Sequence, residues 1–358
     1  MLELRSAEGA FATIEAWLRG RGFFAPGGED LVADLYLGYG LSQTIRRDST
    51  TPPPEPCPLP LAAVSLRDTA GVRPWTGPAQ PVIGPWERTW TTAEYAAAVE
   101  SVRAAIARGD VYQVNLVQHL SAPFAGEAGV LAASLASLNP LVSRALAGDG
   151  WTIVSASPEV FLSRRGRLVR TMPIKGTRPA GDAADLVESS KDAAEHVMIV
   201  DLERNDLSRV CEPGTVRWPK LMSPEAMAGV EHLVSTVEGT LRDGVGLADL
   251  LTATFPGGSV TGAPKIAAVD LIAQLEPVGR GASMGALGWV RGNGDLELAL
   301  TIRTFAVADE RIHFWVGGGV VWDSDPAEEV EESWTKAAPI LRAIGAPFPR
   351  AVSRSAAG

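Results

Sequence analysis

Cysteine, positive charge and long apolar runs are all scarce in this chain of 358 residues. Its two cysteines, Cys57 and Cys211, make no disulfide framework and no zinc-binding spacing, which suits a reducing cytoplasm. The formal net charge of -10 gives no basic field for nucleic acid or an anionic membrane. No stretch approaches the roughly 18 apolar residues of a membrane span, and the N-terminus lacks a signal-peptide pattern. We therefore expect a soluble, cytoplasmic protein that captures any anionic substrate at a local site.

Hydrophobic residues make up 46% of the chain, which is enough for one large core or two moderate ones. The first 90 residues are compositionally loose, and their proline-rich run at 51–58 cannot form a helix or an inner strand. We expect residues 1–90 to be a short, irregular segment that packs on the core. Residues 91–346 should form the main domain, and residues 347–358 a flexible tail.

Periodicity from residue 92 onward predicts both helices and strands. Apolar residues recur at helical spacing from Tyr95 to Ile106, and Gly109 marks the end of that helix. Residues 111–120 alternate, with Gln113 and Asn115 on the polar face of a strand. Further strands are expected at 151–156, 159–163, 167–172, 284–290, 296–303 and 311–316, and helices at 186–206, 263–275 and 327–338. Because the two do not alternate strictly, the pattern favours an α+β fold with mostly antiparallel sheet.

Two of these helices carry acidic pairs at turn spacing. Asp192 and Glu195 share one face of the first helix, and Glu329 and Glu332 share one face of the second. Carboxylate oxygens without histidine or cysteine suit a hard ion such as Mg²⁺. The plainer interpretation of each pair is a solvated helix face.

Features near the C-terminus offer contacts for an anion. Lys336 lies four residues after Glu332 on the same helix face, and Pro339 should kink or end that helix. The glycines Gly317–Gly319 follow an apolar strand, where a backbone without Cβ atoms can bring N–H groups close to a carboxylate, although a bulge explains them equally. Arg303 ends another apolar run and suits a bidentate anionic partner, for which protein carboxylates compete.

Residues 255–265 predict a glycine-rich loop that enters a helix, with Thr261 near the cap and Pro264 in the first turn. The loop resembles a phosphate cradle only superficially. Ile266 stands where the Walker spacing requires serine or threonine, so nucleotide binding is not favoured.

Three single side chains are candidates for chemistry. Lys175 lies in a Pro-Ile-Lys-Gly-Thr-Arg-Pro loop, where an exposed lysine is the plainer interpretation. To act as a nucleophile it must lose its proton, which needs desolvation or nearby positive charge such as Mg²⁺. His232 is either a proton carrier or a satisfied core histidine, and Glu159 is ambiguous by itself.

Seven ordered motifs resemble the chorismate-utilising family, which includes anthranilate synthase component I, aminodeoxychorismate synthase component I, isochorismate synthase and salicylate synthase. They are SPE at 157–159, PIKGTRP at 173–179, EHVMIVDLERNDLSRV at 195–210, HLVSTVEG at 232–239, FPGGSVTGAPK at 255–265, LTIRT at 300–304 and GGGVVWDSDP at 317–326. Chance matches would have to agree in order and spacing as well as in type. The resemblance spans residues 92–344, and it makes residues 91–346 a chorismate-binding catalytic domain.

The resemblance implies a two-layer antiparallel β-sandwich flanked by helices, with chorismate and Mg²⁺ in a cleft between the sheets. The implied metal ligands are carboxylates from two helices: Glu195 and Glu332, with Asp192 and Glu329 supporting the hydrated ion. The implied substrate contacts come from several motifs: Arg303, Lys336, Gly176, Thr177, Gln113 and the backbone of Gly317 and Gly319. Glu159 would protonate the departing C4 hydroxyl, and His232 would lie close to the same oxygen.

Two positions discriminate among the family's branches. Gln113 stands where the isochorismate and salicylate formers carry a water-activating lysine, so water addition is not expected. Anthranilate synthases are similar but carry alanine where this chain has Lys175, and lysine there marks the aminodeoxychorismate branch. The implied mechanism is attack of the Lys175 amine on C2 of chorismate, followed by attack of ammonia on C4 that expels the lysine. The alternatives are anthranilate or aminodeoxyisochorismate synthesis, or a chorismate-binding protein without turnover.

Partners are implied as well. Neither cysteine lies in the context of a glutaminase nucleophile, so a glutamine amidotransferase subunit would supply the ammonia. A separate lyase would then eliminate pyruvate from the product to give 4-aminobenzoate for folate synthesis. Ser283 stands where the family usually shows an aromatic residue near the enolpyruvyl group. The usual tryptophan-binding motif is not recognisable, so no feedback inhibition by tryptophan is expected.

Overall fold

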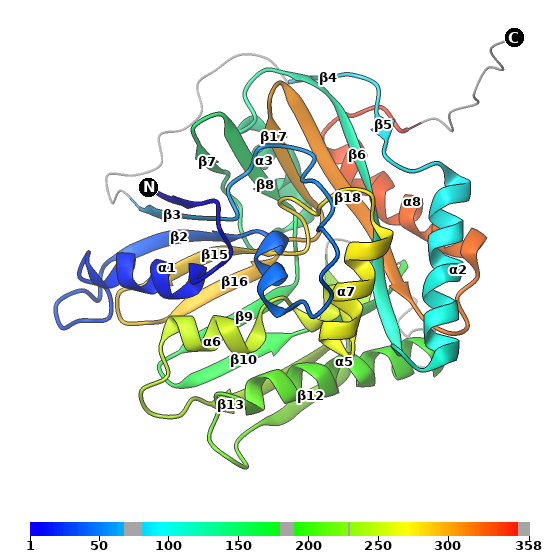
Figure 1. Cartoon of the computed structure of the whole chain (residues 1–358). Helices are drawn as coiled ribbons and strands as arrows, with labels where there is room; N and C mark the ends of the chain where they lie inside the picture. The colour runs from blue at the N-terminus through cyan, green and yellow to red at the C-terminus, as the bar shows by residue number, and fades with distance from the viewer. Residues whose placement is uncertain (68–80, 180–189, 228–229, 350–358) are drawn as a thin grey trace, which may run out of the picture.

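Two antiparallel sheets form the centre of the computed structural model, which describes residues 1–67, 81–179, 190–227 and 230–349 (Figure 1). Within these ranges the side chains of 177–179, 190–192, 226–227 and 230–231 are not described. The larger sheet contains, in order across it, β1 (Leu2–Leu4), β3 (Ala62–Leu66), β2 (Val32–Leu37), β15 (Ala286–Arg291), β16 (Leu296–Leu300), β9 (Val160–Arg165), β10 (Leu168–Met172), β13 (Val230–Thr240) and β11 (Ile174–Pro179), and β12 (Arg217–Met227) also pairs with β13.

The smaller sheet is built around one long strand. Its order is β14 (Gly262–Ala263), β6 (Gln113–Ala125), β18 (Arg311–Val320), β17 (Thr304–Ala308), β8 (Trp151–Ser155) and β7 (Leu146–Gly148), with β4 (Val82–Ile83) and β5 (Glu87–Arg88) paired to β6. All pairings between the described strands are antiparallel. Because β18 pairs with β6 over the whole length of β18, this pairing fixes the position of the residues at the carboxyl end of β18.

Helices cover the sheets. They are α1 (Ala10–Arg19), α2 (Thr92–Arg108), α3 (Val130–Leu135), α5 (Ser190–Ser208), α6 (Leu247–Thr254), α7 (Lys265–Leu275) and α8 (Pro326–Ala343), with short 3₁₀ turns η1 (Tyr39–Ile45), η2 (Ala136–Leu138) and η3 (Gly258–Val260). In Figure 1, α2 and α8 lie side by side next to β6 and β18, and α5 runs along β12 and β13. The α+β sandwich of antiparallel sheets flanked by helices, predicted from the sequence, is therefore confirmed.

Alternation along β18 separates two cores. Phe314 and Val316 point to a cluster with Ile340 and Leu341 of α8, whereas Trp315 belongs to the main core, which contains side chains of both sheets. Successive strand residues face opposite sides, so the odd-numbered residues of β18 face the interior of the sandwich. Among the residues that the structure describes, no helix is long and apolar enough to cross a membrane.

The N-terminal residues are more regular than their composition predicts. Strand β2 pairs with β15 from Leu37↔Ala286 to Val32↔Arg291, and β3 and β1 extend the sheet beyond β2. The expectation of an irregular segment was thus wrong for these strands, because the pairing of β2 with β15 spans more than 200 residues and leaves no local signal. The proline-rich run at 51–58 does lack helix and strand. The domain boundary at 90 stays a prediction, and residues 350–358 of the expected tail lie outside the described residues.

Local signals placed most other elements correctly. Helix α2 begins with a capping box between Thr91 and Glu94 and ends at Gly109, whose φ of 80° only glycine adopts without strain. The expectation that Pro264 lies in the first turn of α7 was wrong, because Pro264 is the N-cap of that helix. Helix α8 does not end at Pro339 but continues to Ala343, and a kink at Pro339 stays a prediction. The burial of residues after Pro339 offsets the missing backbone hydrogen bond, because tertiary packing outweighs local propensity.

A buried histidine pair predicts acid sensitivity. His119 Nε2 lies 3.1 Å from His313 Nδ1, and the two rings stack. Burial lowers the pKa of His119 to about 3 and that of His313 to about 4. The unfolded chain takes up these two protons near pH 6.5 and the folded protein does not, so the free energy of unfolding falls as pH falls from about 6 to 4.5. The expected slope is about 1.4 kcal/mol per pH unit for each histidine.

Urea unfolding of the wild type and of the double variant His119→Gln/His313→Gln between pH 6.5 and 4.5 measures this slope. The double variant should lose most of the pH dependence that the histidines contribute. Equal slopes in both proteins would show that the pair does not titrate on unfolding.

Candidate active site

A bulge in β11 positions Lys175. Lys175 pairs with Leu233 and Arg178 pairs with Glu231, so three steps along β11 oppose two along β13. Gly176, inside the irregularity, has a φ of 64°. Glycine adopts this left-handed conformation at no steric cost, and a bulge of this kind redirects the neighbouring side chain. Lys175 therefore belongs to a strand and not to the exposed loop expected from composition, and its side chain is only 11% exposed.

The ammonium of Lys175 is held by a carboxylate from α5. Its Nζ lies 2.6 Å from Glu195 Oε1, and Gln113 Nε2 donates to the same oxygen at 2.5 Å. Burial by itself lowers the pKa of Lys175. The charge and hydrogen bond of Glu195, together with the charges of Glu159 and Glu203, outweigh burial and raise the pKa above its usual value. In this arrangement the lysine is protonated. It becomes a nucleophile only when the charge of Glu195 is neutralised by another cation or its contact is broken.

Glu159 has the electrostatics of a general acid. It precedes β9, is 4% exposed, and burial raises its pKa to about 7. A hydrogen bond from Ser259 and the charges of Lys175 and Arg303 oppose this rise. A carboxyl group that titrates near neutral pH can hold a proton and give it up at the same pH, as acid catalysis requires.

Arg303 lies in the turn between β16 and β17, with a φ of 52°, and not within a strand as expected. Burial lowers the pKa of its guanidinium, and the nearby charge of Glu159 opposes this effect. The left-handed backbone is costly for arginine, so the surrounding strands must hold it there. The structure thus brings Lys175, Glu159 and Arg303, which are far apart in the sequence, to one place.

His232 supports the bulge. It is 1% exposed, and its Nδ1 lies 2.9 Å from the carbonyl oxygen of Gly176. A carbonyl only accepts, so Nδ1 carries the proton and Nε2 is the basic nitrogen of the neutral ring. This contact ties β13 to the residue after Lys175. The expected role of His232 as a proton carrier stays a prediction.

Three glycines lie inside β18, and not after it as the sequence indicated. A Cβ on Gly317 would stand 1.9 Å from the carbonyl oxygen of Leu116, and a Cβ on Gly319 would stand 2.1 Å from Gln113 Nε2 and 2.6 Å from Glu195 Oε1. Both positions face the interior of the sandwich, where only glycine fits between β18 and the side chains beside Lys175.

The expected metal ligands approach the glycine end of β18 from two helices. A Cβ on Gly318 would stand 3.3 Å from Glu329 Oε2 and 3.7 Å from Glu332 Oε1. The charge of Lys336, the partner of Glu332, also acts on Glu195. Glu329 is 4% exposed, and its Oε1 accepts a hydrogen bond from Ser324 Oγ at 2.6 Å. The side chains of Asp192 and Thr177 lie outside the described residues.

Carboxylate oxygens are the kind of ligand that Mg²⁺ prefers, but the described side chains do not bring a complete set of ligands to one point. Among the side chains that the structure describes, no three of His, Cys, Asp or Glu could together hold a metal ion. Each of the two expected direct ligands instead contacts an ammonium group at 2.6 Å, Glu195 that of Lys175 and Glu332 that of Lys336. Both carboxylates thus lie beside a positive charge, which is the environment that a divalent cation would supply.

Sequence reasoning missed two residues that contact or face Glu159. Ser259, in the turn η3, hydrogen-bonds to it, and Glu203 on α5 is a second buried acid close by. The signal for Glu203 was its position two turns after Glu195 on the same helix face. Ser283 is fully buried, and its hydroxyl donates to the carbonyl oxygen of Thr301 at 3.4 Å.

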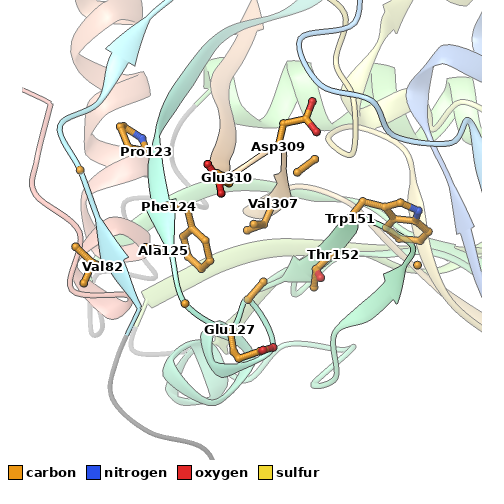
Figure 2. A pocket seen from close by; sticks show the side chains of 16 residues that line it. Val82, Pro123, Phe124, Ala125, Glu127, Trp151, Thr152, Val307, Asp309 and Glu310 are labelled. Atoms are coloured by element: carbon orange, nitrogen blue, oxygen red, sulfur yellow. The ribbon is translucent and has the colours of Figure 1, made fainter.

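A pocket of the described structure lies away from this cluster. Figure 2 shows this pocket of about 760 Å³ beside Trp151, Phe124 and the turn at Asp309 and Glu310, at the opposite end of β18 from the three glycines. Its charged lining residues are all acidic, so it repels an anionic substrate. The buried cluster around Lys175 is the better candidate site because its charges can act on a reacting molecule.

The chain belongs to the family described as chorismate binding enzyme, whose model matches residues 54–342. It is 42% identical to anthranilate synthase component 1 of Streptomyces coelicolor over 72% of this chain and 53% of that protein. It is 39% identical to aminodeoxychorismate synthase component 1 of Bacillus subtilis over 73% of this chain and 57% of that protein. The matched region thus spans little more than half the length of these relatives.

Solved structures agree on the fold. Anthranilate synthase component I from Streptococcus pneumoniae superposes with a TM-score of 0.76 at 28% identity, covering 87% of this chain and 80% of that one. The menaquinone-specific isochorismate synthase of Escherichia coli superposes with a TM-score of 0.73 at 18% identity, covering 96% of this chain and 84% of that one, and shows the fold alone. The named activities of the similar proteins differ, so similarity by itself does not select one.

Proposed function

We propose that this chain is an aminodeoxychorismate synthase component 1, which converts chorismate and ammonia to 4-amino-4-deoxychorismate. The observation that carries the proposal is the buried contact of Lys175 with Glu195, beside a carboxyl group, Glu159, that titrates near neutral pH. Relatives with this name match at 39% identity. A buried lysine next to an acid has the two groups that a covalent substitution requires.

The reaction proceeds in two displacements. The amine of Lys175 attacks C2 of chorismate while the C4–O bond breaks, and Glu159 gives its proton to the departing oxygen, which leaves as water. Ammonia then attacks C4, the C2–N bond breaks, and the electron pair returns to the lysine nitrogen. The proton from the new C4 ammonium returns to Glu159. Two allylic displacements thus place the amine at C4 without altering the ring carboxylate.

Substrate binding uses the remaining residues. Arg303 and the backbone of Gly317 and Gly319 hold the enolpyruvyl carboxylate, since a guanidinium and strand N–H groups suit a planar anion. Gly176 and Thr177 line the ring. Lys336, whose Nζ lies 3.4 Å from the carbonyl oxygen of Gly317, supplies positive charge at the same end of β18.

Mg²⁺ is the cofactor that the acidic residues suit. Glu195 and Glu332 would hold it, with Asp192 and Glu329 supporting its water shell. When bound, the ion neutralises the ring carboxylate of the substrate and the charge of Glu195. Gln113 already hydrogen-bonds to Glu195 and has no basic nitrogen, so it does not activate water.

The ammonia comes from a partner. A glutamine amidotransferase subunit supplies it, and a separate lyase removes pyruvate from the product to give 4-aminobenzoate for folate synthesis. A cytoplasmic location stays a prediction from the sequence.

The specific observation that favours a second function is the 42% identity to an anthranilate synthase. One incubation separates the two. The chain is mixed with chorismate, Mg²⁺ and ammonium at high pH, with aminodeoxychorismate lyase added, and the aromatic products are resolved by chromatography. 4-Aminobenzoate supports our proposal. Anthranilate formed without the lyase supports the alternative, and chorismate binding without either product contradicts both.

Replacement of a strand glycine tests the binding site. Gly317→Ala should lower kcat/KM for chorismate by about 10²-fold, because its Cβ would collide with the Leu116 carbonyl and shift β18 by a large fraction of an ångström. Gly129→Ala is the matched control, since a Cβ there meets nothing within 4 Å and its φ is −60°. Steady-state kinetics measure both. Wild-type kcat/KM in Gly317→Ala would place the substrate elsewhere.

A further inference from the structure

Glu203 is a buried acid on α5 that the proposed reaction does not use. It is 6% exposed, and its Oε2 accepts a hydrogen bond from Thr171 Oγ1 at 2.9 Å. Its Cγ lies 3.4 Å from the position of a Cβ on Gly258. Burying a carboxyl group costs free energy unless its surroundings compensate, so its presence beside the site calls for an explanation.

The same two chain segments hold Glu203 and Glu159. Thr171 bonds to Glu203, and the backbone of Ile174, three residues later, bonds to Glu159. Gly258 packs against Glu203, and its neighbour Ser259 bonds to Glu159. Lys175 interacts with both carboxyl groups. The segments 171–174 and 258–259 therefore set two buried acids next to each other, in the centre of the candidate site.

We propose that Glu203 is a positioning residue that forms a proton-sharing carboxyl pair with Glu159 and keeps Glu159 able to donate above neutral pH. The inference rests on the proposed role of Glu159 as the acid. Glu203 itself contacts no substrate. It acts through its neighbour, because two like charges in a dry site suppress each other's ionisation.

The charges that face the pair come from four elements. Glu203 faces Glu159 near the start of β9, Asp206 on its own helix and Lys265 on α7. Glu159 faces Lys175 on β11 and Arg303 before β17. Burial raises the pKa of Glu203 to about 8 and that of Glu159 to about 7, and the charge of Glu159 adds to the rise at Glu203.

Coupled groups lose their protons in two macroscopic steps that belong to the pair. The pair thus keeps one of its two protons up to a pH of about 8. When Glu159 gives its proton to the departing C4 oxygen and the C4–O bond breaks, the carboxylate that remains is next to a neutral Glu203 and not next to a second negative charge. The proton that ammonia releases later restores Glu159, so atoms and charges balance over the cycle.

The pH profile of Glu203→Gln tests the pair. The amide keeps the volume and the acceptor for Thr171 but removes the second ionisable group. With chorismate consumption as the readout, activity at pH 6.5 should stay within about twofold of wild type. At pH 8.5 it should fall by about tenfold, since Glu159 then titrates alone near 7 instead of sharing a proton up to about 8. Loss of activity by the same factor at every pH would overturn the proposal.

Thr171→Val is the matched control, and we expect it to shift the alkaline limb of the pH profile in the opposite direction. The Thr171 hydrogen bond lowers the pKa of Glu203, so its removal should move the alkaline limb to higher pH. Glu203→Asp restores a carboxyl group and should recover part of the wild-type limb. If both variants show the profile of Glu203→Gln, Glu203 serves packing alone and the proposal fails.

A titration without substrate separates this inference from the proposed function. Carbon-13 spectra of protein labelled at the glutamate carboxyl should show two groups titrating above pH 6.5, and Glu203→Gln should remove one and lower the other. This result supports the pair even if the aromatic product proves to be anthranilate. The absence of any glutamate titrating above pH 6.5 in the wild type would overturn the pair whichever product forms.

Discussion

Lys175→Ala should abolish 4-aminobenzoate formation and allow some amination at C2 instead. Without the side chain, no group can occupy C2 covalently, so ammonia itself attacks C2 as the C4 hydroxyl leaves. The measurement is product chromatography with chorismate, Mg²⁺, ammonium and the lyase. In the absence of ammonia, mass spectrometry of the wild type should show Lys175 carrying chorismate minus one water.

Lys175→Arg is the matched control. Guanidinium keeps a positive charge beside Glu195, which lies 2.6 Å from the wild-type ammonium, but it is not deprotonated in proteins and cannot attack carbon. Chorismate binding should therefore be closer to wild type in this variant than in Lys175→Ala, while C4 amination is lost in both. Wild-type 4-aminobenzoate formation by either variant would refute the covalent role.

Glu159→Gln should lower kcat by about 10²–10⁴-fold, because a positioned general acid contributes a factor of that size. The amide has nearly the same shape but no proton to give to the departing C4 oxygen. Its effect on chorismate affinity should be small, so the loss appears in kcat at saturating substrate.

The wild-type profile provides the corresponding pH test. The acid must be protonated, and the pair of Glu159 and Glu203 releases its two protons between about pH 7 and 8, so kcat should decline as pH rises through that range. In Glu159→Gln this limb should be missing from the residual rate. A variant with wild-type kcat, or one that keeps the same alkaline limb, would show that another group protonates the oxygen.

The fold shows which helices and strands could be predicted from local sequence signals. The helix at 92–108 followed from its apolar spacing and the Gly109 cap, and the strands that flank Glu159 followed from alternation, because these features act within a few residues of each other. The N-terminal strands β1, β2 and β3 did not follow from local signals. Strand β2 is stabilised by pairing with β15 across the sheet, and pairing over that sequence distance has no local pattern.

The candidate site likewise has features that the sequence identified and features that only the structure revealed. Motif order identified Lys175, Glu159 and Arg303, but composition placed the lysine in an exposed loop. Its burial depends on the bulge at Gly176 and on the contact with Glu195, which is contributed by a helix. Glu203 was overlooked because an acid on a helix is usually solvated, and only the packing of η3 and β10 against α5 buries it.

The sequence by itself determined the class of fold, the family, and the residue types available for chemistry: a lysine, acids and strand glycines in a fixed order. Only the tertiary structure decided that Lys175 is buried and protonated, that Gly317 and Gly319 face the interior, and that Glu159 lies beside a second buried acid. The physical reason is that protonation depends on burial and on charges from other elements. The distances between these charged groups are set when β11, α5, β18 and the turn at 258–260 pack together.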